Sequence, residues 1–237
     1  SDLAPFESTA DGFDLDAVEA LHCGSDPTVE DMVGQTCDGS WALTDLTDQQ
    51  FFNFGDIKPG DFGKNVISFH LDDNDGWVCL VPHDLVDAEN THVDPEPEAG
   101  DLTDGQPNPA QQGGELSGEI KALAWNDNDS DGYFEPNLGE TLLYSGTFFN
   151  LFGTNLAIAD SGTGSPLSAT TTKWIGLTWC AGSITYDNTW GLVSCDGSSI
   201  TNQVQTDSVT ASLSAYTEQA RNNSAFRCEN VDLNQPL

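Results

Sequence analysis

Basic residues are scarce in this chain. Its 237 residues include 6 lysines and arginines against 39 aspartates and glutamates, so the formal net charge is −33. Such a negative surface is repelled by phosphate, which excludes nucleic acids and anionic membranes as favourable partners. No apolar run approaches the roughly 20 residues that a bilayer span needs, so we expect no membrane span.

Apolar residues are not scarce. They make up 37% of the chain, beside 23 glycines, which is enough to bury a core and excludes a disordered acidic tail. Scarce lysine with abundant aspartate favours a protein that works in high salt, because about 1 M salt shortens the Debye length to roughly 3 Å and screens self-repulsion. Bound divalent cations would also offset the charge. A merely acidic mesophilic protein is the alternative.

Catalytic motifs are absent from the sequence. The four histidines lack metal-ligand spacing, and no nucleophile elbow or phosphate loop occurs. We therefore assign no catalytic residue and expect a protein that is not an enzyme. Paired carboxylates for glycoside hydrolysis remain an open alternative, because 39 acids make any single pair uninformative.

Six cysteines stand at wide spacing and without a Cys-x-x-Cys pair: Cys23, Cys37, Cys79, Cys180, Cys195 and Cys228. An even count of this kind predicts disulfides in an oxidising, extracellular setting. We predict Cys23–Cys37 and Cys180–Cys195, each closing a short polar loop, which leaves Cys79 to pair with Cys228. Six cysteines allow 15 connectivities, and six buried thiols in a cytoplasmic protein are the alternative.

Two further features bear on a secreted location. Ser1 is expected to be a mature terminus left by removal of a signal peptide. Asn128 and Asn222 begin Asn-x-Ser/Thr sequons and are candidate glycosylation sites. Such tripeptides are common by chance, so they add little to the argument.

Short strands separated by turns dominate the chain from residue 51. Apolar runs and period-two alternation predict strands at 67–71, 77–81, 116–125, 140–147, 173–180 and 204–217. The turn at 73–76 predicts a hairpin between the first two strands. One helical turn is expected at 148–152, a short helix at 13–21, and a loop at 153–171.

This pattern predicts an all-β fold, a β-sandwich with long acidic loops and a few short helices. The sandwich domain is expected to span 51–237. Within it, residues 87–114 are rich in Pro, Glu, Asp, Gly and Gln, and predict a long solvated acidic loop insertion. Residues 1–50 form a separate N-terminal segment that contains the predicted disulfide loop 23–37.

The clearest motif is an acidic loop whose candidate ligands are Asp127, Asp129, Asp131, Tyr133, Glu135 and Glu140. Carboxylates at loop positions 1, 3, 5 and 9, with glycine at 6, match a calcium loop in which the Tyr133 carbonyl is the seventh-position ligand. Leu138 stands where such loops carry a bidentate glutamate, so we expect Glu140 to replace it. We predict Ca²⁺ here. A solvated turn is the alternative. Residues 72–76 match the same motif more weakly and are expected to form a hairpin turn.

An ordered set of motifs resembles the TasA/camelysin family of secreted, fibre-forming proteins of bacteria and archaea. The set comprises FGDIKPGDFG at 54–63, WVC at 77–79, WIGLTWCAG at 174–182, CDGS at 195–198, QTDS at 205–208 and EQARNN at 218–223. It covers roughly residues 51–228, and its acidic version is similar to the members of halophilic archaea. The resemblance implies a jelly-roll-like sandwich, secretion, and filaments of an extracellular matrix. It also implies that an N-terminal segment of one subunit completes the sheet of the next.

The N-terminus departs from the family pattern, which has a Phe-Phe-Ser-Asp-like stretch before the first strand. Residues 1–7 would have to donate the strand here, with Leu3 and Phe6 as apolar anchors and Pro5 interrupting the ladder. The leading hypothesis is a filament subunit whose partner is another copy of itself, joined head to tail and stabilised by Ca²⁺ and high salt. The second is a secreted, calcium-stabilised module that binds carbohydrate or a surface. The third is a secreted protease or other hydrolase.

Overall fold

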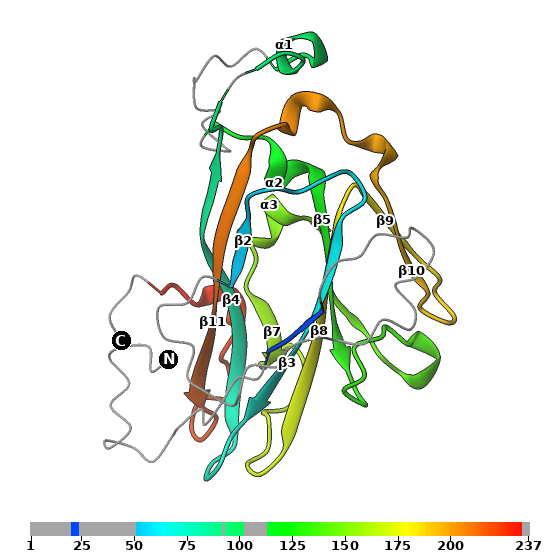
Figure 1. Ribbon diagram of the computed structural model, residues 1–237. Helices are drawn as coiled ribbons and strands as arrows, with labels where there is room; N and C mark the ends of the chain where they lie inside the picture. Colours follow the sequence, from blue (N-terminus) through cyan, green and yellow to red (C-terminus); the bar gives the residue numbers. More distant parts are fainter. Residues whose placement is uncertain (1–19, 24–50, 92, 102–112, 234–237) are drawn as a thin grey trace.

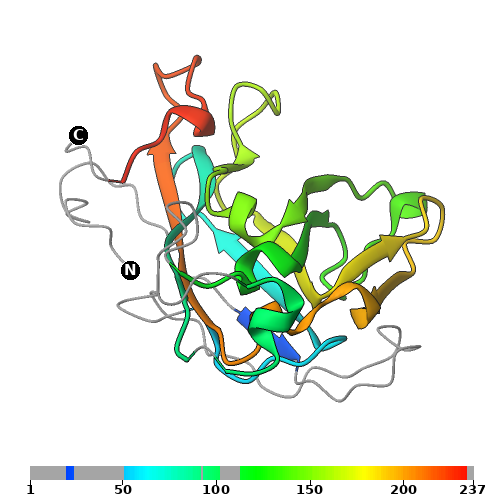
Figure 2. The same cartoon turned by 90° about the horizontal axis from the view of Figure 1, so that it is seen from above.

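The computed structural model describes residues 20–23, 51–91, 93–101 and 113–233 (Figure 1). These residues form antiparallel sheets joined by loops and a few one-turn helices. The predicted all-β sandwich is confirmed. Seen from above, the strands of the two large sheets lie in two layers (Figure 2).

Two large sheets and one small sheet contain all the described strands. The five-stranded sheet has the order β1 (Ala20–Cys23), β3 (Phe62–His70), β8 (Thr172–Ala181), β5 (Ile120–Asp127) and β6 (Leu142–Thr147). The four-stranded sheet has the order β2 (Phe52–Phe54), β11 (Ser208–Gln219), β4 (Gly76–Ala88) and β7 (Leu156–Ala159). A separate hairpin pairs β9 (Ser183–Tyr186) with β10 (Val193–Asp196).

The helical elements are short and lie between strands. The α-helices are α1 (Glu96–Ala99), α2 (Leu116–Glu119) and α3 (Phe148–Leu151), and the 3₁₀ turns are η1 (Pro136–Leu138), η2 (Gly197–Ser199), η3 (Asn202–Val204) and η4 (Cys228–Asn230). The Thr147 side chain caps α3 by accepting a hydrogen bond from the Asn150 backbone N–H. The helical turn predicted at 148–152 is therefore confirmed, one residue shorter.

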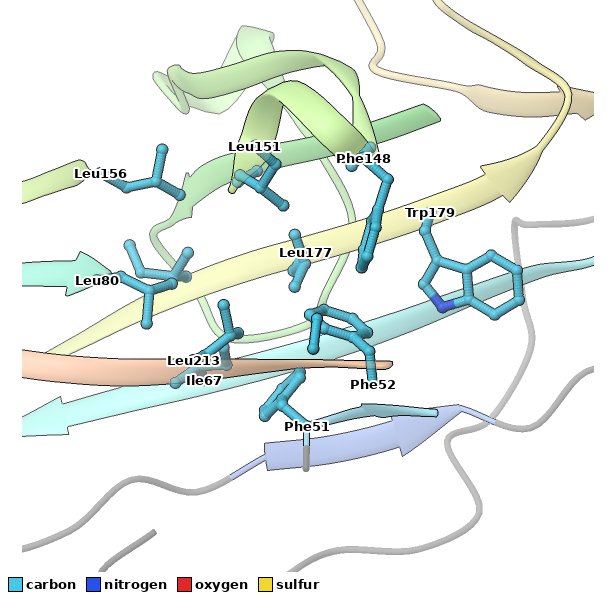
Figure 3. Close-up of a cluster of buried hydrophobic side chains, with 14 of the residues drawn as sticks. Phe51, Phe52, Ile67, Leu80, Phe148, Leu151, Leu156, Leu177, Trp179 and Leu213 are labelled. Atoms are coloured by element: carbon cyan, nitrogen blue, oxygen red, sulfur yellow. The ribbon is translucent and has the colours of Figure 1, made fainter. Parts of the chain in front are cut away.

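The main core lies between the two large sheets (Figure 3). Ile67 and Leu177 come from the five-stranded sheet, and Leu80 and Leu213 from the four-stranded sheet. Phe148 of α3 closes one end and is fully buried. Burial of each such side chain stabilises the fold by about 1.5–3 kcal/mol, so the alternating apolar residues of the sequence determine which faces of the strands meet.

The hairpin predicted at 73–76 is wrong, because the strands it joins do not pair. β3 pairs with β1 and β8, whereas β4 pairs with β11 and β7. The turn at 71–75 therefore crosses from one sheet to the other. Each strand finds a partner distant in sequence because both strands contribute to the core between the sheets, which a local hairpin would not enclose.

Several other elements differ from the sequence-based expectation. Residues 116–119 form α2 before β5 begins, β7 lies inside the predicted loop 153–171, and residues 20–21 belong to a strand rather than to a helix. The predicted solvated insertion 87–114 also differs. Its beginning is the end of β4, and Asp87, Glu96 and Asp101 are buried.

Two predicted disulfides are confirmed. Cys79 on β4 is bonded to Cys228 at η4, and Cys180 on β8 is bonded to Cys195 on β10. These bonds indicate an oxidising, extracellular environment. The predicted Cys23–Cys37 bond and the predicted donor residues Leu3 and Phe6 lie outside the described residues. In the described part of the chain, no helix has the length and apolar character required to cross a membrane.

Candidate metal centre

The predicted calcium loop begins at the last residue of β5 and folds back over the outer face of that strand. Phe134 packs against Trp125, with 6.0 Å between ring centroids, and against Tyr186 of the β9 strand at 5.6 Å. The Trp125 indole N–H donates to the Tyr133 carbonyl over 3.1 Å. This small apolar cluster fixes the loop against the five-stranded sheet.

The predicted carboxylates come together in two overlapping groups. Asp127, Asp129 and Glu140 each place one oxygen within 4.8 Å of the other two, and so do Asp129, Asp131 and Glu135. Asp129 belongs to both groups. Glu140 thus takes the place next to Asp127 that the sequence assigned to it as a replacement for Leu138, which is 56% exposed.

Backbone N–H groups already bind the two buried carboxylates of the loop. Asp127 accepts from Ser130 N–H at 2.6 Å and from Gly132 N–H at 2.9 Å. Glu140 accepts from Asn128 and Glu135 N–H groups, both at 2.7 Å. These bonds hold the loop closed without an ion. Each oxygen keeps a second lone pair, so the same arrangement can also coordinate a cation.

Gly132 is required at the turn of the loop. Its φ is +73°, and a Cβ there would lie 2.8 Å from a methyl carbon of Val66. The glycine predicted at loop position 6 therefore allows both a left-handed conformation and a close approach to β3. The Tyr133 carbonyl, the predicted seventh-position ligand, accepts the Trp125 bond described above.

Charge in the loop is poorly compensated by protein groups. Burial raises the pKa of Asp127 and of Glu140, and neighbouring carboxylates raise both further. Two lysines lie near the loop: Lys64, with its Nζ 3.8 Å from the centre of the Tyr133 ring, and Lys173, whose charge interacts with Glu140 and Asp127. Burial lowers the pKa of Lys64, while Asp131 and Asp127 act to raise it. Lys64 offsets part of the negative charge, and a bound cation would offset more.

The two sequons lie in exposed turns. Asn128 is the second residue of the acidic loop, and Asn222 lies in the turn after β11 with a φ of +63°. The Asn128 backbone N–H binds Glu140, so the loop holds its backbone while its side chain faces solvent.

A pocket of about 210 Å³ lies beside the loop. Trp125 and Lys64 line it from the sheet, and Trp190 and Leu192 line it from the β9–β10 connection. Trp190 is 66% exposed and Leu192 is 55% exposed. The sequence did not single out these two residues, because nothing in their spacing indicates that the β9–β10 connection lies against the acidic loop.

A second acidic group was also missed by the sequence-based argument. Glu89, Asp101 and Glu115 each place one oxygen within 4.8 Å of the others. They come from three separate segments, so no regular spacing connects them.

Comparison with known proteins adds no relative, because neither a protein-family model nor a curated protein matches the chain.

Proposed function

We propose that this chain is the structural subunit of an extracellular filament, resembling TasA/camelysin proteins with their jelly-roll-like sandwich. The observation that carries the proposal is the short strand at one side of β11 in the four-stranded sheet. β11 pairs with β4 along nearly its whole length, from Ser208 to Gln219. On its other side, the described pairing is with β2 at Val209–Ala211.

β2 has three residues and ends at this register, so it does not extend along the part of β11 beyond Ala211. In the five-stranded sheet, the described pairing of β1 with β3 is likewise short, at Lys64–Ile67. Beyond these pairings both strands run towards the turn at 71–75, as Figure 1 shows for β3 and β11. An extended segment could therefore pair with β11.

The occupant that we propose is the N-terminal segment of a second copy. A strand added to an open edge gains main-chain hydrogen bonds, and its alternate side chains enter the adjoining core. Leu3 and Phe6 are the apolar residues that would supply these anchors. If the N-terminal segment of each copy occupies β11 of the next copy, the contact is head to tail and generates a filament rather than a closed dimer.

The environment of the protein supports this proposal. Disulfides suit an extracellular fibre, and subunits that each carry a charge of −33 can stack only where salt or bound cations reduce their repulsion. Ca²⁺ at the 127–140 loop is part of the proposal, because the loop contains oxygen ligands only and has a flexible geometry.

Replacing the donor anchors should prevent assembly. We expect the wild-type protein to form filaments in molar KCl with Ca²⁺, and the double variant Leu3→Asp/Phe6→Asp to remain monomeric, because charged side chains cannot enter an apolar core. Negative-stain electron microscopy and sedimentation measure both outcomes. The double variant Ser8→Asp/Thr9→Asp is the matched control, since it adds the same charge to the same segment at polar positions, and should still polymerise. Wild-type protein that stays monomeric at every salt concentration would exclude the filament.

Removal of one loop carboxylate should reduce the stabilisation by Ca²⁺. We expect the thermal midpoint of the wild-type protein to be higher in Ca²⁺ than in EDTA. In Asp129→Ala this difference should be smaller by the contribution of the loop, because Asp129 is common to both groups of oxygens. Differential scanning calorimetry provides the measurement. Asp73→Ala removes an equal charge from the exposed turn at 71–75 and should keep the full difference. Equal rises of the thermal midpoint in the two variants would show that the loop does not contribute to stabilisation by Ca²⁺.

The pocket beside Trp190 favours the second candidate function, a module that binds carbohydrate. An exposed indole next to a hollow and a polar loop is the arrangement on which a sugar ring can stack. The assembly experiment separates the two functions. A wild-type protein that remains monomeric but binds glycans would support this candidate instead of the filament.

A further inference from the structure

Six carboxyl side chains gather at the end of the sandwich where β4 finishes and β11 begins, the end that carries α1 and α2 in Figure 1. They are Asp87, Glu89, Glu96, Asp101, Glu115 and Asp207, and we call them the β4–β11 cluster. Asp87 is the penultimate residue of β4, and Asp207 immediately precedes β11. Glu115 immediately precedes α2.

The cluster is deeply buried. Asp87, Glu96, Asp101 and Asp207 are 1%, 0%, 3% and 3% exposed, respectively. Glu89 and Glu115 are half-buried, and each has an oxygen within 4.8 Å of the other and of Asp101. Carboxylates in such surroundings cost several kcal/mol each unless they are paired or bind a metal.

One side of the cluster is satisfied by the backbone. Asp207 Oδ2 accepts from the Glu115 and Leu116 N–H groups at 2.8 and 3.2 Å, and Asp87 Oδ2 accepts from the Ser117 N–H at 2.8 Å. These bonds tie the beginning of α2 to the ends of β4 and β11. They occupy only one oxygen of each carboxylate, so the other oxygen of each remains to be explained.

The other oxygens have no donor among the described residues. Asp87 Oδ1, Asp207 Oδ1, Glu115 Oε2 and both oxygens of Glu89 are buried and make no hydrogen bond there. The carboxyl groups of Asp207 and Glu89 lie side by side. A carboxylate oxygen cannot donate, so two adjacent carboxylates need either a proton or a cation between them.

No lysine or arginine supplies the missing charge. All 6 of these residues lie in the described part of the chain, and their ion pairs there involve Asp56, Asp160 and Glu229. The buried oxygens of Asp87, Glu89, Glu115 and Asp207 that lack a donor therefore remain without a compensating lysine or arginine.

We infer that the β4–β11 cluster binds Ca²⁺ through Glu89, Asp101, Glu115 and Asp207. The donor set contains only oxygen atoms, which matches a hard cation, and Ca²⁺ accepts 6–8 such ligands in flexible geometry. Asp87 lies beside these ligands and holds α2 in place through Ser117. The site differs from the 127–140 loop in every ligand.

The ion would join three segments between residues 89 and 115 to the beginning of β11. Glu89 follows β4, Asp101 follows α1, Glu115 precedes α2 and Asp207 precedes β11. A cation here would therefore fasten the described part of the acidic insertion to the sandwich, much as a disulfide would. The inference is independent of the proposed filament, because it concerns the stability of one subunit.

The test measures Ca²⁺ binding by the full-length Asp129→Ala variant, in which the loop site is disabled. Protein freed of metal with EDTA and exchanged into molar KCl at pH 7.5 is titrated with CaCl₂ in a calorimeter. We expect one saturable site. Adding Asp207→Asn should weaken its affinity by about 100-fold, because the amide keeps the bonds to Glu115 and Leu116 N–H but removes one ligand charge. Glu98→Gln, on the exposed side of α1, is the matched control and should bind as before.

Thermal unfolding provides a second readout that does not depend on calorimetric heats. In EDTA, Asp207→Asn should melt above its Asp129→Ala parent, because one repelling charge is gone, whereas in Ca²⁺ it should melt below it. A merely structural role for Asp207 would lower both midpoints. The inference is overturned if the Asp129→Ala protein binds no Ca²⁺, if it melts at the same temperature with Ca²⁺ and with EDTA, or if Asp207→Asn binds Ca²⁺ as tightly as its parent.

Discussion

Loss of the Cys79–Cys228 disulfide should lower the free energy of unfolding by about 5 kcal/mol, as estimated from loop-closure entropy for a separation of 149 residues. The bond joins the central strand β4 to η4, so its removal releases the C-terminal segment from the outer face of the four-stranded sheet. Both cysteines are fully buried beside Val81 and Tyr216. The double variant Cys79→Ala/Cys228→Ala removes the cross-link while keeping small apolar side chains.

The second disulfide is the internal control for this estimate. Cys180–Cys195 encloses a separation of 15 residues, for which the same relation gives about 3 kcal/mol. Urea unfolding in molar KCl, followed by circular dichroism, measures both losses under one condition. An equal or larger loss for Cys180→Ala/Cys195→Ala would contradict an explanation from chain entropy and would place the stabilisation in local packing.

Lowering the salt concentration should destabilise the protein nearly as much. Between about 1 M and 0.01 M salt the Debye length rises from roughly 3 Å to 30 Å, so charges on all sides of the molecule begin to repel one another. We expect this repulsion to cost about 5 kcal/mol, which lowers the thermal midpoint of a chain of this size by about 10–20 °C. Within the described ranges few ion pairs oppose the effect, and the Lys58–Asp56 pair is largely exposed.

Two measurements separate screening from other effects of salt. Calorimetry in KCl is compared with calorimetry in sucrose of equal osmolality, which is excluded from protein surfaces but does not screen charge. If KCl restores the thermal midpoint and sucrose does not, the result supports screening. If both solutes restore it, the result does not support screening. A midpoint that is independent of KCl would show that the charge of −33 is compensated within the molecule.

Local chemistry accounts for the parts that the sequence predicted well. The alternation of Val209, Ala211 and Leu213 with polar residues predicts a strand with one buried face, and β11 has this form. The acidic loop was found because its ligands lie within a span of 14 positions, from Asp127 to Glu140, with Gly132 at the turn. Such features need no knowledge of distant contacts.

Long-range strand pairing determines the parts of the structure that the sequence predicted poorly. Nothing local distinguishes a hairpin at 71–75 from a crossing between sheets, because the difference lies in β8 and β11, far along the chain. The same holds for Asp87 and Asp101, whose surroundings in sequence are typical of a solvated loop. Their burial depends on α2 and β11 packing beside them.

The sequence by itself therefore determined the class of the fold, two disulfides, the acidic loop and the charge that any assembly must overcome. Each of these follows from residue type, short spacing or the elimination of alternatives. Only the tertiary structure decided which strands pair, where β2 lies along β11, and which carboxylates of the acidic insertion are buried together. These depend on contacts between distant segments, where the gain from a shared core outweighs the local preferences of the chain.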